Sequence, residues 1–232
     1  DGTNVGTQLV SDIYPGGDWS NPYHLTKFNG KIYFSANNGP NGFELWVTDG
    51  TSSSTQLVLD IISGTTDSNP SHFEEFNGDL YFSARELYKT NGLVGNATLV
   101  KNINNSGDSN PENLTVYNNK MFFTANNGTN GEEVWSSNGA TFGTQLFMDI
   151  NPTGDSDAHS FTVCNGLLYF NAKDGTSGRE LWVTDGTVAN TLMIEKNAIT
   201  PELNPTNLTV YNNKLYFFLR KILRLKQAPE KS

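Results

Sequence analysis

The chain has 232 residues, of which 17% are charged, and it carries a formal net charge of −9 at pH 7. This acidic balance argues against a general nucleic-acid binder, because such proteins need a concentrated basic face to release counterions from the phosphate backbone. The single cysteine, Cys164, excludes an internal disulfide and a cysteine-based zinc site, and no apolar run approaches the roughly 18 residues that span a bilayer.

Four short segments rich in β-branched and aromatic residues begin the chain, at residues 7–13, 23–28, 31–36 and 43–48. Each segment is bounded by Gly, Asn, Asp or Pro, which is typical of strands joined by turns. Asn29-Gly30 separates the second segment from the third and favours the positive φ angles of a tight hairpin. The pattern therefore predicts an antiparallel sheet of four strands.

The same pattern returns along the chain as an internal repeat. DGT at residues 1–3 recurs at 49–51 and 185–187, with NGL at 91–93 and NGA at 138–140 in the intervening places. FNG-like and LYF-like tripeptides follow each of these at corresponding offsets. The chain is thus expected to be one domain of five repeat units, with these bounds: residues 1–48, 49–90, 91–137, 138–184 and 185–232. The second unit is short because the loop seen at residues 37–43 is missing there.

Units of four antiparallel strands, spaced by 48, 42, 47 and 47 residues, predict an all-β fold in the form of a five-bladed β-propeller. An open β-solenoid is the alternative. If the strand that ends in FNG is innermost, residues 7–13 have no blade of their own and the last unit lacks an outer strand. We therefore expect a closed ring, in which the N- and C-terminal strands pair.

The tail of the last unit allows two interpretations. Residues 208–212, 214–219 and 221–225 match the strands of a final blade, whereas residues 214–226 also match a basic amphipathic segment for a membrane or a calmodulin-like partner. The tripeptide LYF at residues 215–217 lies on the repeat, which favours the strands.

ELWVTDGT at residues 44–51 and 180–187, each followed by TQLV-like and NPxxLTxxNGxLYF-like stretches, resembles the ELWxxDGT-repeat family. The resemblance covers the chain to about residue 218. It implies β-propeller-like repeats of large, mostly bacterial, surface or secreted proteins, usually without an assigned activity. The blade number is also similar to that of five-bladed lectins of the tachylectin type, an analogy of architecture that does not transfer function.

Oxygen-rich loops precede the expected inner strands, and we predict that they contribute to a ligand-binding surface. The candidate residues in these loops are Asp18, Trp19, Ser20, Asn21, Asp67, Asn69, Asp108, Asn110, Asp155 and Asp157. Such loops suit calcium, but none has the EF-hand spacing, and Asp, Ser and Asn before Pro also form ordinary turns by bonding their own backbone. Turn chemistry without a metal or cofactor is the prediction, and calcium is the alternative.

His24 and His72 stand at equivalent positions just after these loops, and both belong to the candidate ligand-binding set. Because two histidines separated by a blade make a poor metal site, we expect them mainly to line a central channel. A recurrent glutamate indicates a shared structural role, such as binding a turn amide, and it occurs as Glu44, Glu86, Glu133 and Glu180. Adjacent Glu74 and Glu75 face opposite sides of a strand, so they do not form the carboxylate pair of a glycosidase.

The tryptophans fall into two groups. Trp46, Trp135 and Trp182 share one repeat position, which predicts packing between blades. Trp19 stands outside the repeat, beside Asp18. Its indole either is exposed and stacks on a sugar ring, or folds back over apolar side chains at the rim.

These features predict a non-enzymatic, secreted or cell-surface module that binds a glycan or a protein through loops on one face of a propeller. The secreted location is what the family resemblance implies. The chain opens without a basic-then-apolar signal pattern, so either its targeting information has been removed or the chain is cytosolic. The alternatives are a propeller glycoside hydrolase and a structural repeat segment without a ligand of its own.

Overall fold

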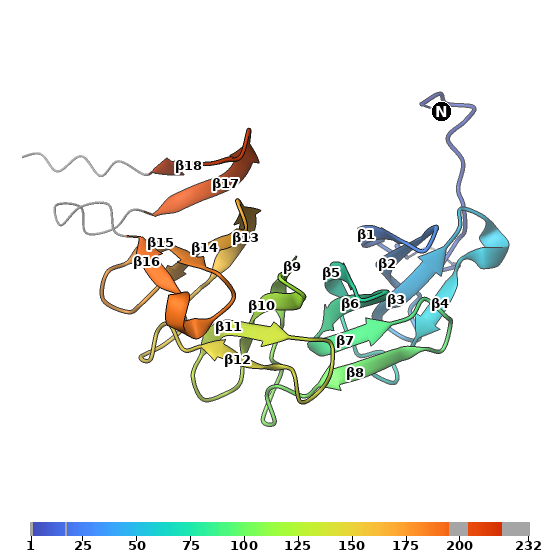
Figure 1. Cartoon of the computed structure of the whole chain (residues 1–232). Helices are drawn as coiled ribbons and strands as arrows, with labels where there is room; N and C mark the ends of the chain where they lie inside the picture. The colour runs from blue at the N-terminus through green and yellow to red at the C-terminus, as the bar shows by residue number, and fades with distance from the viewer. Residues whose placement is uncertain (1, 17, 195–203, 220–232) are drawn as a thin grey trace, which may run out of the picture.

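The computed structural model describes residues 2–16, 18–194 and 204–219 of the chain. These residues form an all-β structure of five antiparallel sheets, which follow one another along an arc (Figure 1). We refer to the sheets as blades 1 to 5. No helix among the described residues is long and apolar enough to cross a membrane.

The strand bounds are as follows. Blade 1 contains β1 (Tyr23–Phe28), β2 (Lys31–Asn37), β3 (Phe43–Thr48) and β4 (Gln56–Leu59), and blade 2 contains β5 (Ser71–Phe76), β6 (Asp79–Ala84), β7 (Glu86–Thr90) and β8 (Ala97–Lys101). Blade 3 contains β9 (Glu112–Tyr117), β10 (Lys120–Asn126), β11 (Glu132–Ser137) and β12 (Gln145–Met148), and blade 4 contains β13 (His159–Cys164), β14 (Leu167–Lys173), β15 (Arg179–Thr184) and β16 (Leu192–Ile194). Blade 5 contains β17 (Pro205–Tyr211) and β18 (Lys214–Leu219), and single 3-10 turns lie at η1 (Ser52–Ser54) and η2 (Val188–Asn190).

Each four-stranded blade has its strands in chain order, as the repeat predicts. The strands that end in the FNG-like tripeptide, β1, β5, β9, β13 and β17, are innermost and neighbour one another in that order (Figure 1). The TQLV-like segment forms the outermost strand, for example β4 and β12. The predicted strands at residues 23–28, 31–36 and 43–48 are confirmed to within one residue.

An Asn-Gly or Asn-Asn pair makes the tight turn that follows each inner strand. Asn29 has φ 47° and Gly30 has φ 75°, which is the pair of positive angles that a type I′ hairpin requires. Asn77 and Gly78 repeat this geometry in blade 2, with φ 53° and 81°. The Asn-Gly signal in the sequence therefore specifies the turn and the register of the strands beside it.

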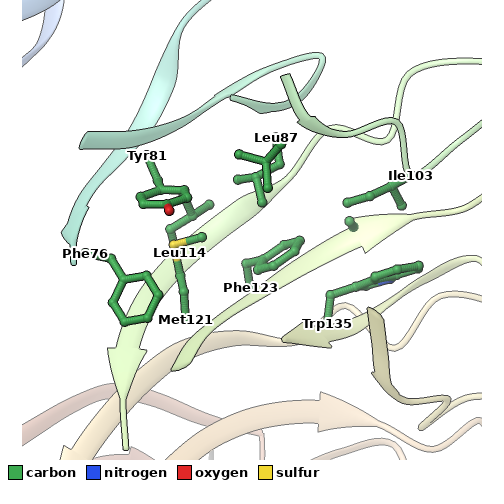
Figure 2. Packing of buried hydrophobic residues seen from close by; sticks show 10 residues of the cluster. Phe76, Tyr81, Leu87, Ile103, Leu114, Met121, Phe123 and Trp135 are labelled. Carbon is green, nitrogen blue, oxygen red and sulfur yellow. The ribbon is translucent and has the colours of Figure 1, made fainter. Parts of the chain in front are cut away.

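The hydrophobic core lies between neighbouring blades, because successive residues of a strand point to opposite faces of the sheet. In β10, Met121 and Phe123 pack against blade 2, while Phe122 packs against blade 4. Figure 2 shows the cluster between blades 2 and 3, where Trp135 lies beside Phe123. The prediction that the repeated tryptophans pack between blades is confirmed for Trp135 and Trp182, which are 6% and 7% exposed.

The recurrent glutamate binds the segment that leads from one blade to the next, which we call a crossing. Glu44 of β3 accepts hydrogen bonds from the amide of Ile61 at 2.9 Å and from the hydroxyl of Ser68 at 2.6 Å. Glu86 accepts the equivalent bonds in blade 2, and Glu133 accepts two amides of the next crossing. Burial raises the pKa of Glu44 and Glu133 to about 7, although these hydrogen bonds oppose the rise. The predicted structural role of the glutamate is confirmed in these three blades.

The expected ring closure is wrong for this structure. Residues 7–13 form no strand and pair with no sheet, and Ile13 instead packs against Phe34 and Trp46 on the outer face of blade 1. Blade 5 has two described strands, β17 and β18, and residues 7–13 lie beside neither of them. The strand interpretation of residues 214–219 is confirmed by β18, whereas residues 221–225 lie outside the described part of the chain.

Candidate functional site

The segments that lead from one blade to the next reach the inner strands at one end of the sheets, which we call the crossing face. There the carbonyl of Ser20 accepts the amide of Asn37 at 2.9 Å, and the carbonyl of Ser109 accepts the amide of Asn126 at 2.9 Å. The hairpin loops at residues 38–42, 127–131 and 174–178 lie at the same face. The crossing face thus brings the loops in which the sequence predicts ligand binding together with the hairpin loops.

The predicted acidic loops use their carboxylates to dock on the preceding blade. Asp67 Oδ1 accepts the amide of Phe43 at 2.8 Å, and Asp155 Oδ1 accepts the amide of Glu132 at 2.7 Å. These two carboxylates therefore have a structural role, but they bind amides of the preceding blade and not the backbone of their own loop, as the predicted turn chemistry would require. No group of three or more His, Cys, Asp or Glu side chains in the described ranges is placed to hold a metal ion.

The two predicted channel histidines lie next to each other. The rings of His24 and His72 are stacked with centroids 6.4 Å apart, and both residues adopt left-handed φ angles, 57° and 51°, at a bulge in the inner strand. His72 Nδ1 accepts the amide of Asn113 at 3.3 Å, so in the neutral ring Nε2 carries the proton. Burial lowers the pKa of His72, and the nearby His24 lowers it further, while Glu112 opposes the shift. The neutral histidine therefore bridges two inner strands.

A polar cavity of about 440 Å³ opens on the crossing face between blades 2 and 3. This volume lies in the range of roughly 300–1,000 Å³ that is usual for small-molecule sites. The lining residues are Ser68, Asn69, Ser71, His72, Ser83, Arg85, Asp108, Asn110, Glu112 and Glu132. All ten side chains carry hydrogen-bonding groups, so the cavity suits a polar ligand better than an apolar one.

The cavity lies against the one four-stranded blade that lacks a long hairpin loop. Residues 38–42 form this loop in blade 1, whereas in blade 2 Arg85 alone joins β6 to β7. Arg85 makes the turn with a left-handed φ of 63°. The shortened second repeat, which is visible in the sequence, thus places a guanidinium where the neighbouring blades carry a loop.

Arg85 is already bound by the protein. Its Nε and Nη2 donate to the carbonyl of Asp67 at 3.0 and 2.8 Å, and its Nη1 lies 3.6 Å from Asp108 Oδ2. The two side chains of this ion pair are 36% and 48% exposed, so the pair contributes little to stability. In the cavity, the positive charge of Arg85 is therefore paired with the carboxylate of Asp108.

Two further carboxylates in the cavity have no such partner. Glu112 begins β9 and Glu132 begins β11, and neither carboxylate has a hydrogen bond to any residue in the described ranges. Burial raises the pKa of Glu132 to about 7, with further contributions from Glu112, Asp157 and Asp155, while Arg179 opposes the shift. This part of the cavity therefore holds two carboxyl groups that accept no hydrogen bond from the described residues, with Arg179 close enough to Glu132 to oppose the rise of its pKa.

Ser83 is a buried polar group at the same cavity. It is 6% exposed and lines the cavity, and its hydroxyl has no hydrogen-bond partner among residues 2–16, 18–194 and 204–219. The equivalent Thr124 and Asn171 of blades 3 and 4 donate to the carbonyls of Glu112 and Pro205. The hydroxyl oxygen itself is not buried, so it reaches the cavity and is free to bond a ligand atom there.

The structure gathers only part of the predicted ligand-binding set. Asn69, His72, Asp108 and Asn110 line the cavity. His24 adjoins the cavity because its ring stacks on that of His72. The main-chain carbonyl of Asp67 accepts a hydrogen bond from Arg85. The remaining predicted residues do not line the cavity, although the last two lie close enough to raise the pKa of Glu132; they are Asp18, Trp19, Ser20, Asn21, Asp155 and Asp157.

The residues at blades 1 and 4 have other surroundings. Asp157 forms ion pairs with Lys173 and with Arg179, the latter at 3.1 Å, and the hydrogen bond from Lys173 lowers the pKa of Asp157 most. Trp19 is 82% exposed. The interpretation that Trp19 folds back over the rim is therefore wrong, and its indole faces solvent on the segment that enters blade 1.

The sequence-based site prediction missed six lining residues: Ser68, Ser71, Ser83, Arg85, Glu112 and Glu132. Two of these occupy repeat positions whose residue type changes from blade to blade. Glu112 takes the place of Tyr23, Ser71 and His159, and Glu132 takes the place of Phe43, Arg85 and Arg179. Comparing variable positions at the strand starts, rather than recurrent loops, would have identified them.

No family model and no curated protein matches the chain. Among solved structures, the chain is similar to a puromycin hydrolase S511A mutant complexed with PGG, with 12% identity over 81% of this chain and 31% of that one and a TM-score of 0.53. It is also similar to the GH74 enzyme of Niastella koreensis, with 10% identity over 74% and 29% of the two chains and a TM-score of 0.50. The computationally designed Ika8 protein has 16% identity over 85% of this chain and 55% of its own, with a TM-score of 0.49.

The chain spans just over half of the designed protein and less than a third of each enzyme. At these identities the likeness to the two enzymes concerns the fold alone, which is β-propeller-like. Function must therefore be argued from the site.

Proposed function

We propose that this chain is a non-enzymatic binding module of the cell surface or the extracellular space that recognises a glycan in the cavity between blades 2 and 3. The resemblance of its repeats to the ELWxxDGT family supports this location and a membership in that family. The cavity supports the binding role.

The main support for the proposal is a contrast between two kinds of repeat position. From blade to blade the structural residues stay the same, whereas residues that line the cavity change. The fastening glutamate keeps the same partners in blade after blade, as Glu44 and Glu86 show. By contrast, the cavity is lined by Glu112 and Glu132, which replace unlike residues of the other blades. Groups that differ in chemistry and converge on one hollow are the usual mark of a specific binding site on a regular scaffold.

A glycan fits this cavity better than a protein surface does. Stable protein interfaces bury roughly 800 Å² on each partner around an apolar centre, whereas this site is a polar hollow. Amides of Asn69 and Asn110 and the hydroxyl of Ser71 offer donors and acceptors for sugar hydroxyls. Tyr23 adjoins the rim through its hydroxyl, which lies 3.5 Å from Asn69 Oδ1 and leaves an aromatic ring near the site.

Glycoside hydrolysis is the second candidate, because Glu112 and Glu132 line one cavity. A hydrolase of this class uses two carboxyl groups, one of which stays protonated near neutral pH to act as the acid. The raised pKa of Glu132, about 7, meets that condition.

A glycan-array screen of the purified chain tests the binding proposal. Binding to a defined set of glycans, weakened when Ser71→Leu fills the cavity and kept in Thr26→Leu on blade 1, is the expected result. Mass spectrometry of the best ligand after prolonged incubation separates the two candidates, since cleaved products indicate a hydrolase. A chain that is folded by circular dichroism but binds no glycan and cleaves none would support a structural repeat segment instead.

A further inference from the structure

The charges that line the cavity do not balance. Asp108, Glu112 and Glu132 contribute three carboxylates, and Arg85 contributes the only positive side chain among the lining residues, apart from the neutral His72. Arg85 lies 3.6 Å from Asp108 and uses two of its donors on the carbonyl of Asp67. Glu112 and Glu132 are therefore available to a positively charged group of a ligand.

The second observation is independent of charge. Ser83 is 94% buried, lines the cavity and has a hydroxyl without a hydrogen-bond partner in the described part of the chain. Because this hydroxyl reaches the cavity, a ligand atom that donates to it or accepts from it forms a hydrogen bond there. The cavity thus offers two carboxylate acceptors and a hydroxyl to the same ligand.

We infer that this cavity binds a sugar that carries a free, protonated amine, with the ammonium placed between Glu112 and Glu132 and a sugar hydroxyl bonded to Ser83. This inference rests on the proposed glycan-binding function and names the ligand class of the same site. A compact ammonium has three donors and no acceptor, which matches carboxylates that the protein leaves without donors.

An amino sugar fits the lining better than a lysine side chain does. A lysine presents a four-carbon stem that needs apolar surface, and the ten lining residues include no aliphatic or phenyl side chain. The hydroxyls of a sugar ring instead find partners in Asn69, Asn110 and Ser71. The pKa of Glu132, raised to about 7 by burial and by neighbouring acids, agrees with a site that lacks its cation.

Calorimetric titration with a fully deacetylated glucosamine tetramer and with the N-acetylglucosamine tetramer tests the inference on the native chain. The two probes share their backbone and differ in the charged amine, so no variant is needed for this arm. We expect the deacetylated tetramer to bind about tenfold more tightly or better, as charge-assisted hydrogen bonds require. A third arm with Nα-acetyl-lysine amide, which carries an ammonium without a sugar, is expected to bind more weakly.

Three isosteric variants locate the contact. Glu112→Gln and Glu132→Gln should each weaken binding of the deacetylated tetramer by about tenfold. Glu75→Gln is the matched control, because Glu75 is exposed and does not line the cavity. It should keep the native affinity.

Equal binding of the two tetramers, or unchanged affinity in both cavity variants, would overturn the inference. Tight binding of the lysine amide would overturn the commitment to a sugar. If a neutral glycan binds the native chain while the deacetylated tetramer does not, the proposed glycan binding stands and the ammonium site fails. If no sugar of any charge binds, the proposed function fails as well.

Discussion

Trp135 and Trp182 occupy the same repeat position in neighbouring blades but differ in one hydrogen bond. The indole N–H of Trp182 donates to the carbonyl of Ala172 at 3.2 Å, whereas that of Trp135 is buried without a partner in the described structure. Replacing each by phenylalanine removes the same ring atoms from a similarly buried site. The comparison between the two variants therefore isolates the N–H group.

The expected difference follows from the usual energies of these groups. Trp182→Phe loses a hydrogen bond with a net contribution of about 0.5–1.5 kcal/mol, in addition to packing. Trp135→Phe removes an unpaired buried donor, whose desolvation costs about 1–3 kcal/mol and offsets part of the lost packing. Trp182→Phe should thus lower the free energy of unfolding by roughly 2 kcal/mol more than Trp135→Phe.

Urea unfolding of the two variants and the native chain, followed by circular dichroism, measures this difference. Trp135→Ala serves as the control for burial and should cost about 3–5 kcal/mol. Equal losses in the two phenylalanine variants, or a larger loss in Trp135→Phe, would refute the assignment of the unpaired donor. A native-like stability of Trp135→Ala would refute its place in the core shown in Figure 2.

Three further predictions concern other parts of the fold. Gly139→Ala should destabilise the chain by about 1–3 kcal/mol more than Gly78→Ala in urea unfolding. Both glycines have a positive φ, 92° for Gly139 and 81° for Gly78. A Cβ at Gly139 would lie 2.5 Å from a tyrosine hydroxyl, whereas a Cβ at Gly78 meets nothing within 4 Å. Equal losses of unfolding free energy in the two variants would therefore contradict this packing. The free energy of unfolding should fall as the pH rises from about 5 through 7. Burial raises the folded-state pKa of Glu44 and Glu133 from 4.5 to about 7. Over this pH range the folded chain therefore holds protons that the unfolded chain has lost, so rising pH favours unfolding. Glu133→Gln should reduce the difference between urea midpoints at pH 5 and pH 8, and an unchanged difference would count against the shift. Trp19→Phe should remove most acrylamide quenching of the fluorescence, since Trp19 is 82% exposed, and quenching equal to that of the native chain would show that another tryptophan is accessible.

The blades could be predicted from the sequence because their signals are local. Asn29-Gly30 specifies its hairpin by backbone geometry, and the alternation within each LYF-like strand specifies which side chains face each neighbouring blade. The fastening role of Glu44 could also be predicted, because a residue that recurs with the repeat serves the repeat.

The ring closure and the cavity could not be predicted in the same way, because both depend on contacts between distant segments. The closure required residues 7–13 to find a partner strand, and their composition alone does not say which sheet they join. The cavity depends on the short turn at Arg85 and on Glu112 and Glu132 meeting across the starts of β9 and β11. The sequence predicts that Asp67 and Asp155 bind a ligand, but their carboxylates bind main-chain amides of the preceding blade. The sequence alone does not distinguish an aspartate with this structural role from one that binds a ligand.

Mapping amide chemical shifts in a ¹⁵N-labelled sample, titrated with the tightest glycan of the array, tests the binding cavity most directly. The amides of Ser71, Ser83 and Arg85 in blade 2 and of Glu112 and Glu132 in blade 3 line or flank the cavity. We predict that the largest shifts fall on these residues and saturate with the same dissociation constant as the calorimetric titration. Shifts confined to the equivalent strand starts of blades 1 and 4, or to the hairpins at the opposite end of the sheets, would contradict a binding site between blades 2 and 3.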